Sequence, residues 1–400
     1  MRTRTTRTPK PRVALALAGG GPLGAIHEIG ALCALQDSLQ GLELHRLDHY
    51  VGVSAGGFIA AGLANGMTPR ELCSAFIGPQ GEGEVFDPAW LMVPAYGEFL
   101  RRSLRVPGLA ASALWRATLG RKPLTHSIER LASSLPTGIF SNEEIDRRLA
   151  RAFSRPGRSN DFRRLRARLT LVATNLDTGE AAPFGRPGWD HVPISRAVQA
   201  GAALPGLFPP VRIEGQDYVD GALKKTLHAT VALEEGVDLL LCLNPLVPFH
   251  ATDAAGTGRI ADGGLPAVLS QTFRAMIHSR LALGMKHYER AYPGTDIVLL
   301  EPDPRDTRLR QANTFSYRQR RELAEHAYQQ TRALLLQRRD TLVPTLARHG
   351  ITLREDVLRA PSQLLPERRP ASRLGRAVAD LQQAMDHLGR LLPPPARQVP

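Results

Sequence analysis

The pentapeptide Gly52-Val53-Ser54-Ala55-Gly56 carries the clearest chemical signal in this sequence. It fits the pattern G-x-S-x-G, in which a serine stands on a sharp turn between a strand and a helix. Glycines on both sides remove side chains that would clash at the turn, and the positive end of the following helix stabilises developing negative charge. The motif predicts Ser54 as the nucleophile of an acyl-transfer reaction, with an ordinary Gly/Ser-rich turn as the alternative.

A glycine-rich loop, GGGPLG at residues 19–24, precedes that motif. Glycines between a strand and a helix let backbone N–H groups point outward and bind an anion. Gly19, Gly21 and Gly24 also fit the G-x-G-x-x-G pattern of dinucleotide-binding folds. Such a fold requires an acidic residue about 20 positions later, at the end of the second strand. Here the second strand leads into the Ser54 motif instead, so the loop alone is weak evidence.

A third element, Asp220-Gly221-Ala222, follows the apolar pair Tyr218-Val219. A carboxylate at the end of a strand can approach another loop closely when a glycine follows it. An Asp-Gly pair is otherwise an ordinary turn, so the element has meaning only beside the other two.

The elements that must position these residues follow from short apolar runs that alternate with helical spacing. Strands are expected at residues 13–18, 48–53, 169–173, 218–219, 238–243 and 296–300, and helices at 24–39, 55–64, 143–168, 266–290 and 316–338. The opening order of strand, glycine loop, helix, strand, turn and helix is typical of a parallel α/β sheet.

The three elements together, in this order, resemble the patatin-like phospholipases over about residues 13–304. Two further runs add to the resemblance, ALPGLFPPV at residues 203–211 and TNLDTGE at 174–180. The resemblance implies a three-layer α/β fold with a mainly parallel central sheet, to which a C-terminal helical extension is added. It also implies a serine lipid acyl hydrolase of the phospholipase A or lysophospholipase kind, acting on phospholipids or other acyl-ester lipids.

The resemblance further implies a role for each motif. Backbone N–H groups of Gly20 and Gly21 form the oxyanion hole, Ser54 attacks, and Asp220 is the base of a catalytic dyad that needs no metal and no cofactor. One position departs from the family pattern, because Leu23 stands where the family usually has Arg or Lys. Pro22 before it has no N–H to donate. We expect activity to survive this change, since the main-chain donors remain.

Charge and composition suggest the organisation of the rest of the chain. Residues 1–12 carry five basic groups and residues 305–400 carry 18 arginines against nine acids, whereas residues 13–304 are almost neutral within a net charge of +13. We expect a disordered basic arm, a hydrolase domain with a helical cap insertion at 85–135, and a basic extension that contacts an anionic membrane. Three cysteines and no apolar signal segment favour a cytoplasmic protein with peripheral membrane contact.

Three alternatives stay open at this point. Ser54, Asp220 and either His228 or His250 stand in the order of an α/β-hydrolase triad, but such folds build several strands before the serine. A non-catalytic lipid-binding or scaffolding protein on the same fold is motivated by Leu23 and the basic ends. Nucleic-acid binding suits the basic ends, but no recognition motif supports it. The sequence does not indicate an oligomeric state.

Overall fold

A central sheet of eight strands organises the fold in the computed structural model, which describes residues 10–77, 91–96, 136–250, 259–306, 308 and 317–365. The strand order is β6-β7-β4-β3-β1-β8-β9, with β5 also paired to β4. The strands are β1 (Val13–Leu17), β3 (His49–Val53), β4 (Arg168–Asn175), β5 (Ala181–Phe184), β6 (Val211–Ile213), β7 (Gln216–Asp220), β8 (Leu239–Leu243) and β9 (Asp296–Leu300). Neighbours from β4 to β9 are parallel, while β5 and β7 are antiparallel to β4.

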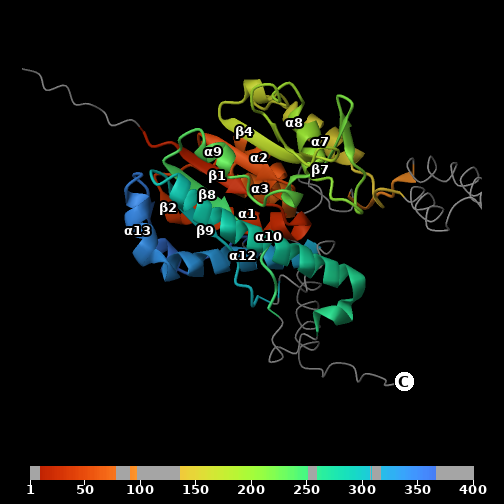
Figure 1. Ribbon diagram of the computed structural model, residues 1–400. Coiled ribbons are helices and arrows are strands. Elements are labelled where there is room, and N and C mark those ends of the chain that lie inside the picture. The colour runs from red at the N-terminus through yellow and green to blue at the C-terminus, as the bar shows by residue number, and fades with distance from the viewer. Residues whose placement is uncertain are drawn as a thin grey trace, which may run out of the picture. The chain divides into compact units, whose positions relative to one another are not determined.

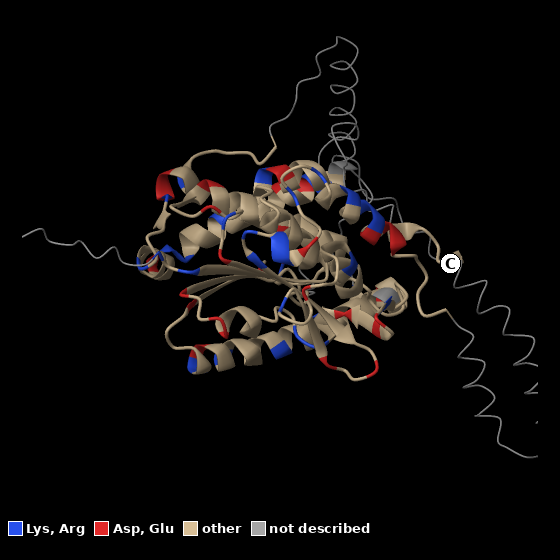
Figure 2. Cartoon of the chain, turned by 90° about the horizontal axis from the view of Figure 1, so that it is seen from above, with Lys and Arg blue, Asp and Glu red and all other residues tan. Residues whose placement is uncertain are grey.

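Helices cover both faces of this sheet, which Figure 2 shows edge-on. On one face, α9 (Thr230–Leu233) and α10 (Gly264–Ala291) pack against alternate residues of β1 and β8, including Ala14, Ala16, Leu240 and Cys242. On the other face lie α1 (Gly21–Ser38) and α2 (Ala55–Ala64), with α8 (Ile194–Gly201) beside α2. Because β1 and β8 are buried on both faces, their sequences are continuous apolar runs, whereas β3, equally buried, begins with His49.

A second layer of helices covers α1. Both α3 (Pro69–Ile77) and α12 (Tyr317–Gln337) pack on it, so α1 is apolar on nearly all sides (Figure 1). A Cβ added at Gly30 would lie 2.5 Å from the carbonyl oxygen of Ala324, which shows how closely the backbones of α1 and α12 approach. Two short helices, α13 (Arg339–Ala347) and α14 (Glu355–Arg359), follow, and β10 (Thr352–Leu353) pairs with β2 (Leu39–Gln40).

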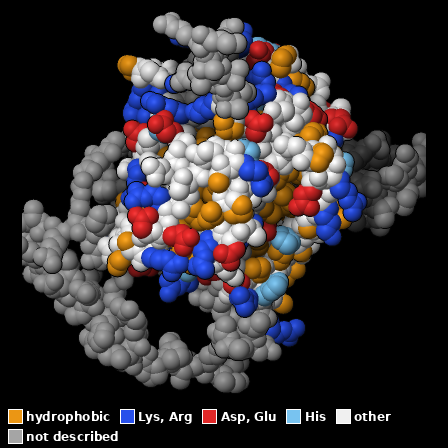
Figure 3. All heavy atoms as spheres, turned by 90° about the vertical axis from the view of Figure 1, so that its left-hand side faces the viewer, with side chains coloured by type: hydrophobic (Ala, Val, Ile, Leu, Met, Phe, Trp, Pro, Cys, Tyr) orange, Lys and Arg blue, Asp and Glu red, His pale blue; other side chains and the backbone are white. Residues whose placement is uncertain are grey.

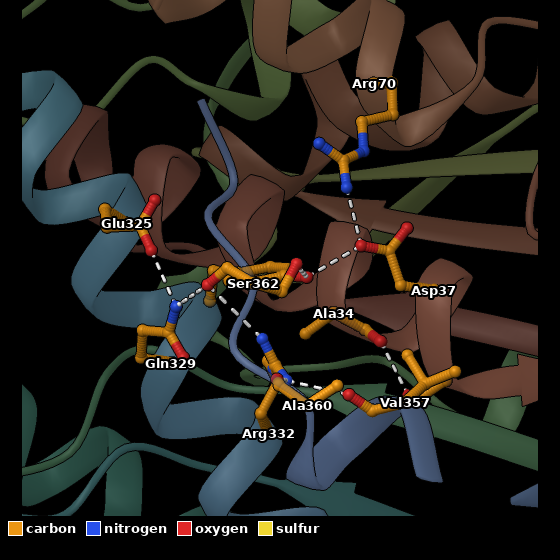
Figure 4. Close-up of polar contacts among 11 residues, drawn as sticks. Ala34, Asp37, Arg70, Glu325, Gln329, Arg332, Val357, Ala360 and Ser362 are labelled. Carbon is orange, nitrogen blue, oxygen red and sulfur yellow. Dashed lines mark hydrogen bonds and ion pairs between the residues drawn. The ribbon is translucent and has the colours of Figure 1, made fainter. Parts of the chain in front are cut away.

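A polar cluster holds this helical layer together (Figure 4). The guanidinium of Arg332, only 5% exposed, donates to the carbonyl oxygens of Val357, Leu358 and Ala360. The carboxylate of Asp37 on α1 accepts from Tyr328 Oη of α12 at 2.8 Å and from Arg70 of α3 at 2.5 Å. Residues 1–362 thereby form one compact unit, and residues 363–400 fall in a second. The division expected from composition, at residues 304 and 305, stays a prediction.

The expected three-layer α/β fold with a mainly parallel sheet and C-terminal helices is confirmed. The expected helix at 143–168 is wrong in its second half: α7 (Glu143–Phe153) ends before Pro156 and Gly157, where φ is +80°. The expected arm at 1–12 is described only from residue 10, and the expected cap at 85–135 only at 91–96, so both otherwise lie outside the described residues. Across the described ranges, no helix is long and apolar enough to cross a membrane.

Candidate active site

Ser54 stands between the end of β3 and the start of α2, in a backbone conformation that side chains rarely adopt. Its φ is 53° and its ψ is −124°. Such a conformation costs about 1–3 kcal/mol and persists only where the surroundings impose it. The flanking glycines allow the turn, because a Cβ at Gly56 would lie 2.5 Å from the carbonyl oxygens of Leu17 and Ala18. Ser54 occupies the N-cap position of α2 but makes no capping hydrogen bond, which leaves its hydroxyl available.

The pairing of β4 brings Asp220 to Ser54. One edge of β4 pairs with β5 along Leu171–Thr174, so β3 and β7 must share the other edge. The last pair of β3 is Val53 with Val172, and the next residue of β4, Ala173, pairs with Asp220 at the end of β7. The two strands therefore meet head to head, and the Oγ of Ser54 donates to Oδ2 of Asp220 at 2.6 Å.

Hydrogen bonds and close packing fix the position of Asp220. Its side chain accepts a second hydrogen bond, from the N–H of Ala222 to Oδ1 at 2.9 Å, and its own N–H donates to the Ala203 carbonyl oxygen. It is 2% exposed. Burial raises the pKa of its carboxyl from 3.8 to about 6, against the opposing effect of the Ser54 and Ala222 hydrogen bonds. Gly221 permits this position, since a Cβ there would lie 2.2 Å from the Val172 carbonyl oxygen.

The glycine loop lies directly against the serine. A Cβ at Gly19 would lie 2.9 Å from Cβ of Ser54 and 3.4 Å from its Oγ. Gly20 is the N-cap of α1, and Gly21 has a φ of +58°. Among the described residues, no acceptor pairs with the N–H of Gly20 or Gly21, so both donors are available at the helix N-terminus.

An apolar cavity of about 290 Å³ opens at the dyad. Of the described residues that line it, only Ser54 and Asp220 have polar side chains. The rest come from α1, α2, α3, α7 and three loops: Gly21, Pro22, Ala25, Ala55, Phe58, Phe76, Leu91, Met92, Phe140, Ile145, Ala202, Leu204, Leu207 and Phe208. Four of these residues are phenylalanines, and three of the four lie outside every motif recognised in the sequence. Only Phe208, within the ALPGLFPPV run, carried a signal.

The two candidate histidines lie elsewhere. His228 is buried, its Nε2 faces the carbonyl oxygen of Gly221 at 3.2 Å, and burial lowers its pKa to about 4. His250 is exposed, and its main-chain N–H donates to the Pro304 carbonyl oxygen. Within the described part of the chain, neither ring hydrogen-bonds to Ser54 or Asp220.

Comparison with known proteins identifies the family of the chain. Two solved structures are similar to the chain: VipD from Legionella pneumophila, at 17% identity and a TM-score of 0.37, covering 82% of this chain and 67% of that one, and the type III effector protein ExoU, at 18% identity and a TM-score of 0.33, covering 95% and 64%. The chain thus spans about two thirds of the length of either protein. The family model of the patatin-like phospholipases matches residues 15–233, more than half of the chain, and includes all three motifs. This chain belongs to the patatin-like phospholipase family.

Proposed function

We propose that this chain is a carboxylic ester hydrolase that cleaves acyl-ester lipids, in the manner of a phospholipase A or lysophospholipase, through a Ser54–Asp220 dyad. Its family acts on lipids. The observation that carries the proposal is the 2.6 Å hydrogen bond from Ser54 to a buried carboxylate inside a cavity lined otherwise by apolar side chains. An apolar cavity suits an acyl chain, and the dyad lies where the ester of such a chain would reach.

In the first half-reaction, Oγ of Ser54 forms a bond to the ester carbonyl carbon while its proton passes to Oδ2 of Asp220. The resulting oxyanion accepts hydrogen bonds from the N–H groups of Gly20 and Gly21. As the carbon–oxygen bond to the alcohol breaks, the leaving oxygen takes the proton from Asp220. In the second half-reaction, Asp220 takes a proton from water, the hydroxide attacks the acyl-enzyme, and Ser54 Oγ recovers its proton as the fatty acid leaves.

The pKa of about 6 suits Asp220 for this role. At pH 7 most of the carboxyl is ionised and can accept a proton. It is also more basic than an exposed aspartate, which makes proton transfer from serine less unfavourable.

The presence of Leu23, where the family usually has Arg or Lys, bears on how the oxyanion is stabilised. The side chain supplies no cation, and it is not one of the described residues that line the cavity. Among the described residues at the cavity, the main-chain donors of the glycine loop and the N-terminal ends of α1 and α2 are the groups that can stabilise the charge.

Purified protein tested against phospholipids, lysophospholipids, acylglycerols and short nitrophenyl esters checks the proposal. Ester hydrolysis that Ser54→Ala abolishes, with an unchanged melting temperature, is the expected result. Lipid binding without hydrolysis of any substrate would instead favour the non-catalytic alternative.

We also propose a cytoplasmic protein that contacts anionic membranes through its basic C-terminal region. Support comes from the arginine excess of residues 305–400 and from three buried free thiols. Residues 366–400 lie outside the compact unit at 1–362, so we expect that unit to fold without them. We expect their deletion to reduce salt-sensitive binding to anionic vesicles while hydrolysis of a soluble ester persists. Equal binding by the full-length and truncated proteins would reject this role.

A further inference from the structure

Three loops meet beside the cavity: residues 91–96, 136–141 and 202–209. Main-chain hydrogen bonds join them. The N–H groups of Ile139 and Phe140 donate to the Leu207 carbonyl oxygen at 3.0 and 2.9 Å. The N–H of Ala95 donates to the Ile139 carbonyl oxygen at 3.0 Å, and that of Ser141 to Val93 at 2.7 Å. The three loops therefore form one connected surface.

This surface presents large apolar side chains to solvent, and we call them the apolar rim. The exposed fractions are 42% for Met92, 42% for Val93, 72% for Tyr96, 52% for Ile139, 37% for Leu204 and 37% for Leu207. Met92, Leu204 and Leu207 also line the cavity, so the rim stands at its mouth.

The rim carries no charge. Residues 91–96, 136–141 and 202–209 contain no Asp, Glu, Lys, Arg or His, although 22% of the whole chain is charged. The face of the molecule that carries α13 differs, because acidic and basic side chains are interspersed across it (Figure 3). A connected apolar patch without charges is typical of a surface that binds an apolar partner.

The position of the rim distinguishes between a lipid surface and a protein as that partner. A protein bound there would cover the mouth of the cavity. A lipid aggregate would instead present acyl chains to the opening, so that a chain could enter without crossing water. We propose that the apolar rim inserts into the surface of uncharged or zwitterionic lipid aggregates and delivers substrate to Ser54. This inference rests on the proposed function, and it is independent of the basic C-terminal region.

The test uses the full-length chain and the double variant Tyr96→Asp/Ile139→Asp. Both side chains are exposed, and neither lines the cavity. Binding to vesicles of non-hydrolysable diether phosphatidylcholine is measured at high salt, which suppresses attraction to the basic ends. We expect the wild type to bind, and the double variant to bind about tenfold or more weakly, because two apolar groups no longer leave water.

Val343→Asp provides the matched control, since Val343 on α13 is 41% exposed and lies outside the rim. It should bind as the wild type does. Both variants should hydrolyse a soluble short-chain ester at the wild-type rate. Equal vesicle binding by the wild type and the double variant, or a wild-type dimer that the double variant disperses, would overturn the rim proposal. If the wild type itself does not hydrolyse the soluble ester, the proposed function is overturned instead.

Discussion

Ser54 and Asp220 lie 166 residues apart in the chain, yet their side chains are joined by a hydrogen bond of 2.6 Å. The contact depends on β4, whose edge pairs first with β3 and then with β7. A strand pairing fixes neighbouring backbones to within a fraction of a residue, so the dyad is held by the sheet itself. The sheet therefore fixes the ends of the two strands that carry Ser54 and Asp220.

Asp220→Asn tests whether the carboxylate is the base. The amide preserves the shape of the side chain but cannot accept the serine proton. We expect kcat to fall by about 10²–10⁴-fold, the usual contribution of a general base. His250→Ala serves as the control and should leave kcat unchanged, since His250 is exposed and takes no part in the hydrogen bonds of Ser54 and Asp220. If the histidine variant were as impaired as Asp220→Asn, a triad would replace the dyad.

The pH dependence of kcat/KM reports the same group. Asp220 must be ionised to act, and burial raises its pKa to about 6. Activity should therefore be low at acidic pH, reach half its maximum near pH 6 and level off above pH 7. An exposed aspartate would keep its activity to about pH 4. The profile is measured with a soluble ester, and the uncatalysed hydrolysis of that ester is subtracted at each pH. A midpoint near pH 4 would contradict a buried base.

Gly19→Ala probes the contact between the glycine loop and the serine. The added Cβ would lie 2.9 Å from Cβ of Ser54, so the loop or the serine must shift. Because displacing a reacting group by about 1 Å can cost about 10²-fold in rate, we expect at least that loss of kcat. Gly294→Ala is the matched control, as no atom lies within 4 Å of its added Cβ. Full activity of Gly19→Ala would show that the loop does not position the reacting groups.

Glu28 on α1 should make stability depend on pH. Its side chain is 0% exposed, and within the described residues neither carboxylate oxygen has a hydrogen-bond partner. Burial raises its pKa well above the ordinary value of 4.5. The nearby Ala18 N–H, which donates its hydrogen bond to the Leu243 carbonyl oxygen, opposes this with a smaller effect. The folded state therefore keeps the proton, and stability that is complete below pH 4.5 decreases as the pH rises toward the folded-state pKa.

Glu28→Gln stays neutral at every pH and should escape this loss. At pH 8 the variant should melt several degrees above the wild type, and the two should converge as the pH approaches 4.5. Glu43→Gln, whose carboxylate is 59% exposed, controls for the loss of a charge. A Glu28→Gln variant that is less stable at pH 8 would mean that the ionised carboxylate has a stabilising partner.

The sequence predicted the parts of the fold that local patterns determine. The strands at 48–53 and 296–300 and the helix at 55–64 match β3, β9 and α2 closely, because short segments rich in apolar residues with turn residues at their ends are typical of strands. β5, with the sequence AAPF, was not expected, because Ala and Pro are poor strand formers. Its strand conformation depends on its pairing with β4 rather than on its own residues.

The helices after residue 304 were expected as a separate extension because their composition changes. Two of the arginines in this region are buried inside the structure, while others, such as Arg348 and Arg359, are exposed. Arg320 and Arg332 are only 4% and 5% exposed, and their long side chains pack between α12 and its neighbours. Composition alone cannot distinguish a buried arginine from a solvated one.

Part of the candidate site could likewise be predicted from the sequence, and part of it could not. Each motif could be recognised because its glycines permit a local conformation, as at Gly56 and Gly221. The cavity and the apolar rim could not, since residues 91–96, 136–141 and 202–209 come together only through pairing between distant loops. No local pattern records such a contact.

Covalent labelling tests the central claim most directly. A fluorophosphonate probe reacts with an activated serine, and peptide mapping by mass spectrometry identifies the residue that carries the adduct. The proposed dyad predicts one adduct on Ser54 of the wild type, slower labelling of Asp220→Asn and none of Ser54→Ala. A wild-type protein that hydrolyses esters but carries its adduct on another residue, or carries none, would contradict the account.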